Sequence, residues 1–153
     1  MAQRFSTGLI ASMLCTGSFQ DVMANGVLRF FTGAQPATAD DAETGTLLLQ
    51  VTISSGAFTP GAATNGLNFD DTTTTIITKE PAEIWSGVGL ADGTAGWFRF
   101  YDNTRTTGAS TTAKRFDGSC ATSGGQATMA STSIVTGATT TVSSCTVTLP
   151  KQA

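Results

Sequence analysis

Short runs of alternating apolar and polar residues recur along most of the chain, and each run predicts a β-strand. In residues 46–53 four aliphatic side chains share one face, and Gln50 and Thr52 share the other. In residues 139–149 Cys145 shares the apolar face with Val147 and Leu149. Further strands are expected at 27–31, 67–69, 74–78, 84–86, 114–116 and 126–135. Short strands at intervals of about ten residues, joined by Gly-rich turns, favour an all-β domain with an antiparallel β-sandwich or jelly-roll-like architecture.

The most aromatic stretch of the chain is Trp-Phe-Arg-Phe-Tyr at residues 97–101. Strand alternation places its two Phe rings on one face and its Trp and Tyr rings on the other, with Arg99 between them. A strand with large rings on both faces needs cover on both sides, so we expect it in the middle of a sheet. The residues expected to form the scaffold of the core are Trp97, Phe98, Phe100, Tyr101 and Phe116.

The first 25 residues have a different period, and they predict a short helical segment. Apolar residues in 5–14 recur at helical spacing, with Ser6 or Thr7 as the N-cap. Ser18 and Asp21 then form a capping box for a second short turn, which Asn25-Gly26 closes. We therefore divide the chain into a helical lead-in at 1–25 and a β-sandwich domain at 26–153. The apolar side of the lead-in either covers the open end of the domain's own core or docks on a neighbouring subunit.

The composition excludes several classes of function. Only 12% of the 153 residues are charged and the net charge is −3, so the chain lacks the clustered Lys and Arg of a nucleic-acid-binding surface. It has no apolar run long enough to span a membrane, and Ser12 interrupts the apolar stretch near the start, so we expect no signal peptide. The absence of His removes the triads and metal sites that depend on it. No cofactor is expected.

Three groups of acidic residues are candidates for metal or acid–base chemistry. Asp40, Asp41 and Glu43 resemble a calcium loop, but they lack the spacing of an EF-hand, and a solvated loop is the expected interpretation. The pair 70–71 is interpreted in the same way. Asp102 and Asp117 lie near strand ends, where two carboxylates of a glycosidase would flank the scissile bond. Asp before Asn or Gly is also typical of turns, so we expect a turn at 117–118 and no enzymatic activity.

The aromatic face of residues 97–101 suggests an alternative function. Trp97 and Tyr101 could stack against a sugar ring, which would make the chain a carbohydrate-binding β-sandwich module. Alternating aromatic residues in a sandwich more often belong to the core.

The three cysteines, Cys15, Cys120 and Cys145, have no C-x-x-C spacing for zinc or a redox centre. Since their number is odd, at least one thiol is free or pairs with another molecule. One interpretation is that they are small, inert side chains. The other is that Cys15 bonds to Cys120 or Cys145 of a neighbouring subunit and locks an assembly outside the reducing cytosol.

Six motifs between residues 24 and 150 carry a resemblance to a known family. They are ANGVLRFFTGAQPATAD at 24–40, GTLL at 45–48, GAF at 56–58, GWFR at 96–99, RFDG at 115–118 and TVSSCTVT at 141–148. In these motifs the chain resembles small structural proteins encoded by tailed bacteriophages. None of the motifs is catalytic, and the cysteines depart from the pattern of the family.

The resemblance implies a virion component that is made in the host cytoplasm and decorates the capsid or forms a collar at the neck. The alternative, a carbohydrate-binding module, would be associated with a tail or fibre. Its expected partners are the major capsid protein or neck and connector proteins, together with copies of itself. No nucleic acid or membrane is expected among them.

Overall fold

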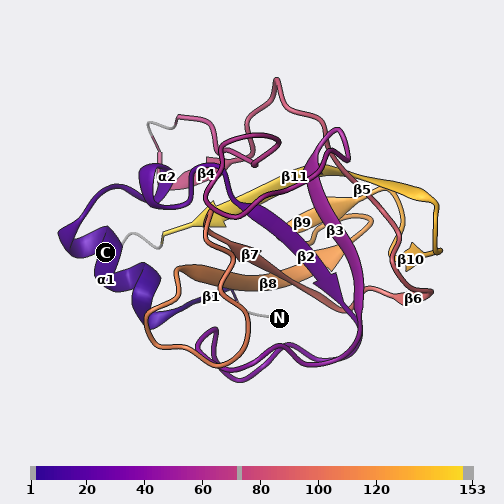
Figure 1. Ribbon diagram of the computed structural model, residues 1–153, viewed down its shortest axis with the longest axis horizontal. Helices are drawn as coiled ribbons and strands as arrows, with labels where there is room; N and C mark the ends of the chain where they lie inside the picture. The colour runs from indigo at the N-terminus through magenta and orange to yellow at the C-terminus, as the bar shows by residue number, and fades with distance from the viewer. Residues whose placement is uncertain (1–2, 72–73, 150–153) are drawn as a thin grey trace.

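The computed structural model describes residues 3–71 and 74–149, and Figure 1 shows the arrangement of their helices and strands. The elements in chain order are β1 (Arg4–Phe5), α1 (Thr7–Cys15), α2 (Phe19–Val22), β2 (Val27–Phe31), β3 (Leu47–Ile53), β4 (Ile76–Thr78), β5 (Trp85–Val88), β6 (Gly93–Thr94), β7 (Trp97–Tyr101), β8 (Arg115–Ala121), β9 (Ala127–Met129), β10 (Ser133–Ile134) and β11 (Thr139–Thr148). The strands predicted at 27–31 and 97–101 have these bounds in the structure.

The main sheet closes on itself and forms a barrel of seven strands. The hydrogen-bonded order is β8, β7, β2, β3, β5 and β11, and β9 then pairs with both β11 and β8. The prediction of a β-sandwich or jelly roll is therefore wrong, although the chain is mostly β as expected. Two helices lie within the first 25 residues, after the short strand β1. A sandwich consists of two separate sheets with edge strands, whereas in a closed barrel every strand has a neighbour on each side.

The barrel closes through an unusual connection between β8 and β9. The predicted turn at 117–118 is wrong, because both residues lie inside β8. The chain turns instead at 122–126, where Gly124 has a φ of 76°. This turn sets β9 parallel to β8, with Cys120 opposite Ala127. Parallel neighbours normally need a much longer crossover, so a sequence pattern predicts a hairpin here and misses the closure.

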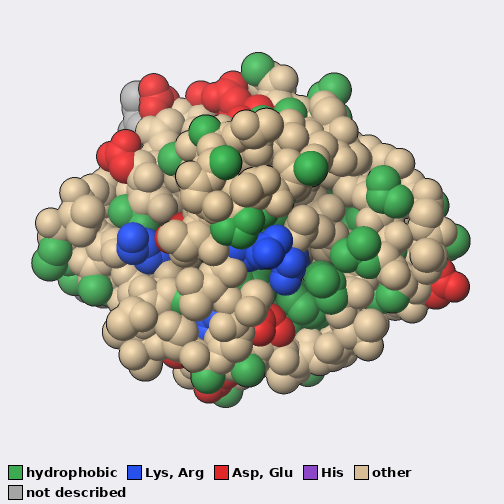
Figure 2. Space-filling view, in the orientation of Figure 1, with side chains coloured by type: hydrophobic (Ala, Val, Ile, Leu, Met, Phe, Trp, Pro, Cys, Tyr) green, Lys and Arg blue, Asp and Glu red, His purple; other side chains and the backbone are tan. Residues whose placement is uncertain are grey.

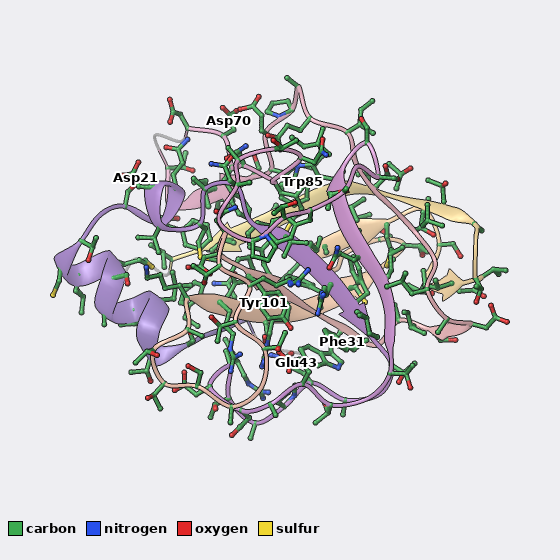
Figure 3. All side chains as sticks on the ribbon, in the orientation of Figure 1. Asp21, Phe31, Glu43, Asp70, Trp85 and Tyr101 are labelled. Carbon is green, nitrogen blue, oxygen red and sulfur yellow. The ribbon has the colours of Figure 1, made fainter. Side chains whose placement is uncertain are left out.

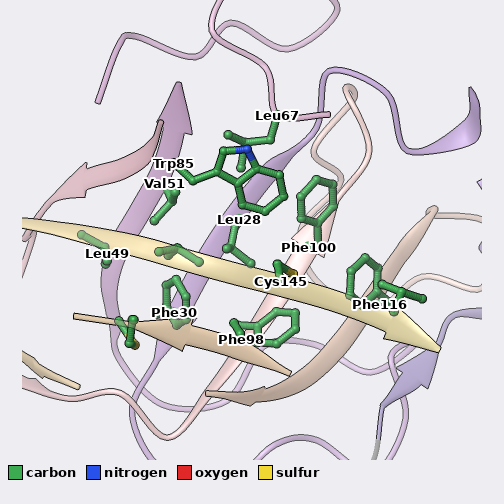
Figure 4. Close-up of a cluster of buried hydrophobic side chains, with 14 of the residues drawn as sticks. Leu28, Phe30, Leu49, Val51, Leu67, Trp85, Phe98, Phe100, Phe116 and Cys145 are labelled. Carbon is green, nitrogen blue, oxygen red and sulfur yellow. The ribbon is translucent and has the colours of Figure 1, made fainter. Parts of the chain in front are cut away.

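The inside of the barrel is filled by aromatic and aliphatic side chains (Figure 4). Every residue of β7 is buried, and β7 lies between β2 and β8, as its two aromatic faces predicted. Phe98 and Phe100 belong to the inner cluster. Phe100 stacks on Phe116 at 5.4 Å, whereas Phe98 meets Phe116 edge to face at 5.8 Å. Trp97 and Tyr101 are equally buried but lie on the outer face of the strand, outside this cluster.

The lead-in has the predicted caps and covers the barrel's core. The side chain of Ser6 accepts a hydrogen bond from the Leu9 amide at the start of α1, and Ser18 forms the predicted capping box at α2. Leu9, Phe19 and Met23 belong to the same hydrophobic cluster as the barrel interior. Both helices lie at one end of the barrel, on the left of Figure 1. Neither helix of the described chain is long and apolar enough to cross a membrane.

The short strand β1, which the sequence did not predict, joins this lead-in to the barrel. Its residues pair with β8, with Arg4 opposite Asp117 and Phe5 opposite Phe116. The side-chain amide of Gln3 also exchanges two hydrogen bonds with the backbone of Thr148 in β11. The N-terminal segment thus bridges β8 and β11 beyond the beginning of β9, whose first residue, Ala127, pairs with Cys120 and Cys145.

The interior packing predicts a specific cost at Gly118. A Cβ atom there would lie 2.6 Å from Cζ of Phe98 and 2.5 Å from Oε1 of Gln126, so a ring of the core must move. We expect Gly118→Ala to lower the free energy of unfolding by about 1–3 kcal/mol, the usual cost of overpacking. Urea denaturation followed by tryptophan fluorescence measures this difference.

Gly17→Ala is the matched control, because a Cβ atom at that position would make an ordinary contact of 3.4 Å with Asp21. Its effect should stay within about 0.5 kcal/mol. Equal stabilities for the two variants would contradict the packing of Phe98 against Gly118.

Candidate functional site

Charged side chains lie buried on the outer face of the barrel. Arg29 of β2, Arg99 of β7 and Asp117 of β8 occupy one cross-strand row. Arg99 and Asp117 are fully buried, and the guanidinium donates two hydrogen bonds to the carboxylate, from Nε at 2.6 Å and from Nη2 at 2.8 Å. Such a bidentate arrangement is the strongest form of the ion pair and fixes both side chains. The row therefore joins β7 and β8 through side chains as well as through the backbone.

Glu43 lies next to this row, on the long connection between β2 and β3. One of its oxygens accepts a hydrogen bond from the Tyr101 hydroxyl at 2.7 Å and lies 3.3 Å from Nη1 of Arg99. The other accepts a hydrogen bond from the Gly108 amide at 2.9 Å. Figure 3 shows Glu43 and Tyr101 close together below β2. A single carboxylate thus holds the 32–46 connection and the 102–114 loop against β7.

Arg115, at the start of β8, also holds these two segments, the 32–46 connection and the 102–114 loop. Its guanidinium is buried and donates hydrogen bonds to the carbonyl oxygens of Ala39 at 2.7 Å, Asp40 at 3.0 Å and Thr106 at 3.0 Å. Its Nη1 also lies 3.8 Å from Oε1 of Glu43. Five donors in a fixed geometry suit a site where several backbone carbonyls are buried together. The residues Glu43, Arg99, Tyr101, Arg115 and Asp117 are called the clamp below.

Burial and hydrogen bonding shift the pKa values of the clamp. Burial, and then the hydrogen bond to Glu43, raise the pKa of Tyr101 above its ordinary value. Burial acts to raise the pKa of Glu43, but hydrogen bonds from Tyr101 and Gly108, together with the charge of Arg99, lower it below the usual range. Burial raises the pKa of Asp117, and the hydrogen bonds from Arg99 oppose it. The ion pairs and hydrogen bonds within the clamp therefore stabilise its charged side chains in a buried position.

The candidate calcium loop is built as part of the scaffold. Asp40 accepts hydrogen bonds from the backbone amide and the hydroxyl of Thr7 at the start of α1, at 2.9 and 2.6 Å. Asp41 accepts two from Thr38, at 2.9 and 3.0 Å. Within residues 3–71 and 74–149 no group of three His, Cys, Asp or Glu side chains is placed to hold a metal ion. Asp70, in the other acidic pair, accepts a hydrogen bond from the following amide.

The residues of the candidate acid–base pair have separate structural contacts. Asp117 is fully buried against Arg99, and Asp102 accepts hydrogen bonds from the amide and hydroxyl of Thr104. Burial also removes the candidate sugar platform from solvent, since Trp97 is 0% and Tyr101 1% exposed. Trp97 instead stacks on Phe31 at 4.7 Å with 17° between the ring planes. These rings offer no free flat surface to a sugar.

The three cysteines are free thiols in the structure. Cys15 is exposed, at the end of α1. Cys120 and Cys145 pair with opposite sides of the same β9 residue, Ala127. They are therefore two strands apart, about 10 Å between Cα atoms, which is too far for a disulfide. Burial raises the pKa of Cys120 to about 11 and that of Cys145 to about 12, so both thiols are poorly reactive.

The central role of Glu43 was not predicted, because this residue was expected in a solvated loop. The available signal was Arg99, in a strand whose other residues are all aromatic, and Arg115, which directly precedes Phe116. Buried guanidinium groups need carboxylates or carbonyls as partners, and Glu43 is one of few acidic residues in a chain with little charge. The spacing of 56 residues between Glu43 and Arg99 gave no hint that they meet.

Comparison of the chain with protein-family models, with curated proteins and with solved structures finds no match.

The buried ion pair predicts a large effect of neutralising Asp117. Asp117→Asn leaves the Arg99 charge buried without its carboxylate, and we expect a loss of about 3–5 kcal/mol in the free energy of unfolding. Denaturant titration gives the value. Asp71→Asn, at an exposed position, is the control and should change stability by less than about 0.5 kcal/mol. Similar small losses in both variants would show that the pair contributes little.

The lowered pKa of Glu43 predicts part of the acid sensitivity of the fold. A carboxylate whose pKa is lower in the folded state stabilises it fully above the unfolded-state value, about 4.3, and this contribution is lost as the pH falls through the folded-state pKa. The stability difference between the wild type and Glu43→Gln should therefore be largest near pH 7 and shrink towards pH 3. Urea midpoints at several pH values test this, and a difference independent of pH would contradict it.

Proposed function

We propose that this chain is a non-enzymatic structural component of a tailed-bacteriophage particle. It decorates or stabilises the capsid, or forms a collar at the neck, through contacts that repeat from subunit to subunit. The proposal rests on the resemblance of the sequence motifs and on the surface of α1. Arg99 and Asp117, two charged side chains that could serve in catalysis, are buried and form an ion pair with each other. Their structural role supports a non-enzymatic assignment.

The observation that carries the proposal is the outer surface of α1. The helix contains no charged residue, and it buries Leu9 while exposing Ile10 by 46% and Leu14 by 80%. Surface helices normally present charged or polar residues to water, so an uncharged helix with exposed aliphatic side chains is typical of a contact surface. One side of the helix covers the barrel core and the other is available to a neighbouring subunit.

Cys15 adds the option of a covalent link at the same surface. It follows Leu14 directly and is exposed, whereas Cys145 is fully buried and Cys120 is partly buried. A link through Cys15 to the same residue of a neighbour needs no unfolding, and a link to Cys145 does. Oxidation outside the cytosol would then join subunits in pairs.

Purified particles test the structural role directly. We expect mass spectrometry of particles isolated on a density gradient to find this chain in a fixed ratio to the major capsid protein. Gels run with and without reductant then show whether a Cys15-linked dimer forms. Absence of the chain from particles that are otherwise complete would overturn the proposal, whereas an unlinked chain in the particles would remove the disulfide alone.

A variant on α1 tests the proposed contact surface. Burying a Leu side chain is worth about 1.5–3 kcal/mol, so Leu14→Asp should weaken incorporation into particles by roughly 10- to 100-fold. Ile84→Asp is the matched control, because Ile84 is also an exposed aliphatic residue, 60% exposed, and lies outside α1 in the segment before β5. Quantitative mass spectrometry of complemented particles gives the ratio. Equal incorporation of the two variants would argue against α1 as the contact.

A further inference from the structure

A groove on the outside of the barrel carries two arginines and no acidic side chain. Its volume is about 350 Å³, and it lies where β2, β3 and β5 meet the 102–114 loop. The residues that line it are Arg29, Gln50, Thr52, Ser55, Gly56, Val88, Leu90 and Arg105. Figure 2 shows Lys and Arg side chains over β2 near the middle of the visible face, with hydrophobic side chains beside them.

Neutral side chains contact the two arginines of this groove. Arg29 donates a hydrogen bond from Nε to Oε1 of Gln50 at 2.9 Å, and its guanidinium carbon lies 5.8 Å from the ring centre of Tyr101. Arg105 lies over the ring of Phe58 at 5.5 Å. In the described part of the chain, the ion pairs belong to Arg99 and Arg115 and none involves these two arginines. Burial lowers the pKa of Arg29 and the charge of Arg105 acts in the same direction, while Tyr101 and the more distant Glu43 oppose them.

The walls of the groove are held in a fixed and costly conformation. Ser55 has a φ of 58° and Arg105 a φ of 50°, values that L-residues other than Asn and Asp rarely adopt. The Thr52 hydroxyl donates to the carbonyl of Gly56 at 2.7 Å, and the hydroxyls of Ser55 and Ser86 lie 2.8 Å apart. Strained backbone of this kind concentrates at ligand-binding positions, where the surrounding structure maintains it.

We propose that this groove binds a carboxylate side chain carried by a segment of a partner protein. Guanidinium groups hold carboxylates through paired hydrogen bonds, and an anion between Arg29 and Arg105 would relieve their mutual repulsion. The choice of a protein ligand comes from the opposite wall, where Val88 is 42% and Leu90 55% exposed. A small inorganic anion would leave these side chains in water, whereas an aliphatic residue next to the carboxylate would cover them.

The identity of the partner as a virion protein rests on the proposed function, but the site itself does not. Binding is therefore measured on the isolated full-length chain, with the peptide acetyl-Leu-Glu-Leu-amide as the probe. The peptide with Gln in place of Glu and inorganic phosphate at equal ionic strength are the comparison ligands. Two-dimensional NMR titration, including the Nε resonances of Arg29 and Arg105, gives the affinities.

We expect the acidic peptide to move both Arg Nε resonances and to bind about tenfold more tightly than the Gln peptide, since a charge-assisted pair is lost in the latter. Arg105→Gln should weaken binding of the acidic peptide by about the same factor. Lys114→Gln removes one positive charge outside the groove and should leave the affinity unchanged. Arg105→Gly is the second variant, because Gly adopts the same φ freely and the fold is then not at risk.

Three results would overturn the proposal. They are equal affinity for the Glu and Gln peptides, unchanged affinity in both Arg105 variants, and phosphate binding as tight as that of the acidic peptide. The last result would assign the groove to small oxyanions. Failure here leaves the particle experiment unaffected, and a chain that binds the peptide but is absent from particles would refute the structural role alone.

Discussion

The central constraint on this fold is that β7 needs cover on both faces. Its inner face presents Phe98 and Phe100, and its outer face presents Trp97, Arg99 and Tyr101. The barrel interior covers the first pair with rings from neighbouring strands. The second set needs a different cover, because a guanidinium cannot be buried without partners. The long connection at 32–46 supplies that cover through Glu43, so the position of this connection follows from the charge on β7.

The two faces are coupled through β8. On the inner side, Gly118 leaves the space that the Phe98 ring occupies, and Phe116 contacts both Phe rings of β7. On the outer side the intervening residue, Asp117, binds Arg99. A shift of one residue in the register between β7 and β8 would move Asp117 into the apolar interior and place Phe116 outside. The ion pair and the ring packing therefore specify the same register independently.

The sequence predicted local features well and long-range pairing poorly. The N-cap at Ser6, the capping box at Ser18 and the burial of both faces of 97–101 each follow from residues within a few positions of one another. The closure of the barrel depends on the 122–126 turn, which sets β9 parallel to β8, and no periodicity distinguishes that from a hairpin. The Asp117-Gly118 pair misled for a related reason. Its residue types are typical of turns, but here tertiary contacts with Arg99 and Phe98 determine its conformation.

The same arrangement accounts for the charge left in the groove. Arg29 and Arg99 are directly opposite each other on β2 and β7, and Asp117 continues the row on the far side of Arg99. Asp117 therefore neutralises Arg99, and Glu43 adds a second contact to the same guanidinium. Arg29, at the other end of the row, is left with the amide oxygen of Gln50. The excess of positive charge beside β3 is thus a consequence of how β7 is covered, and it makes this part of a weakly charged surface a specific place for an anion.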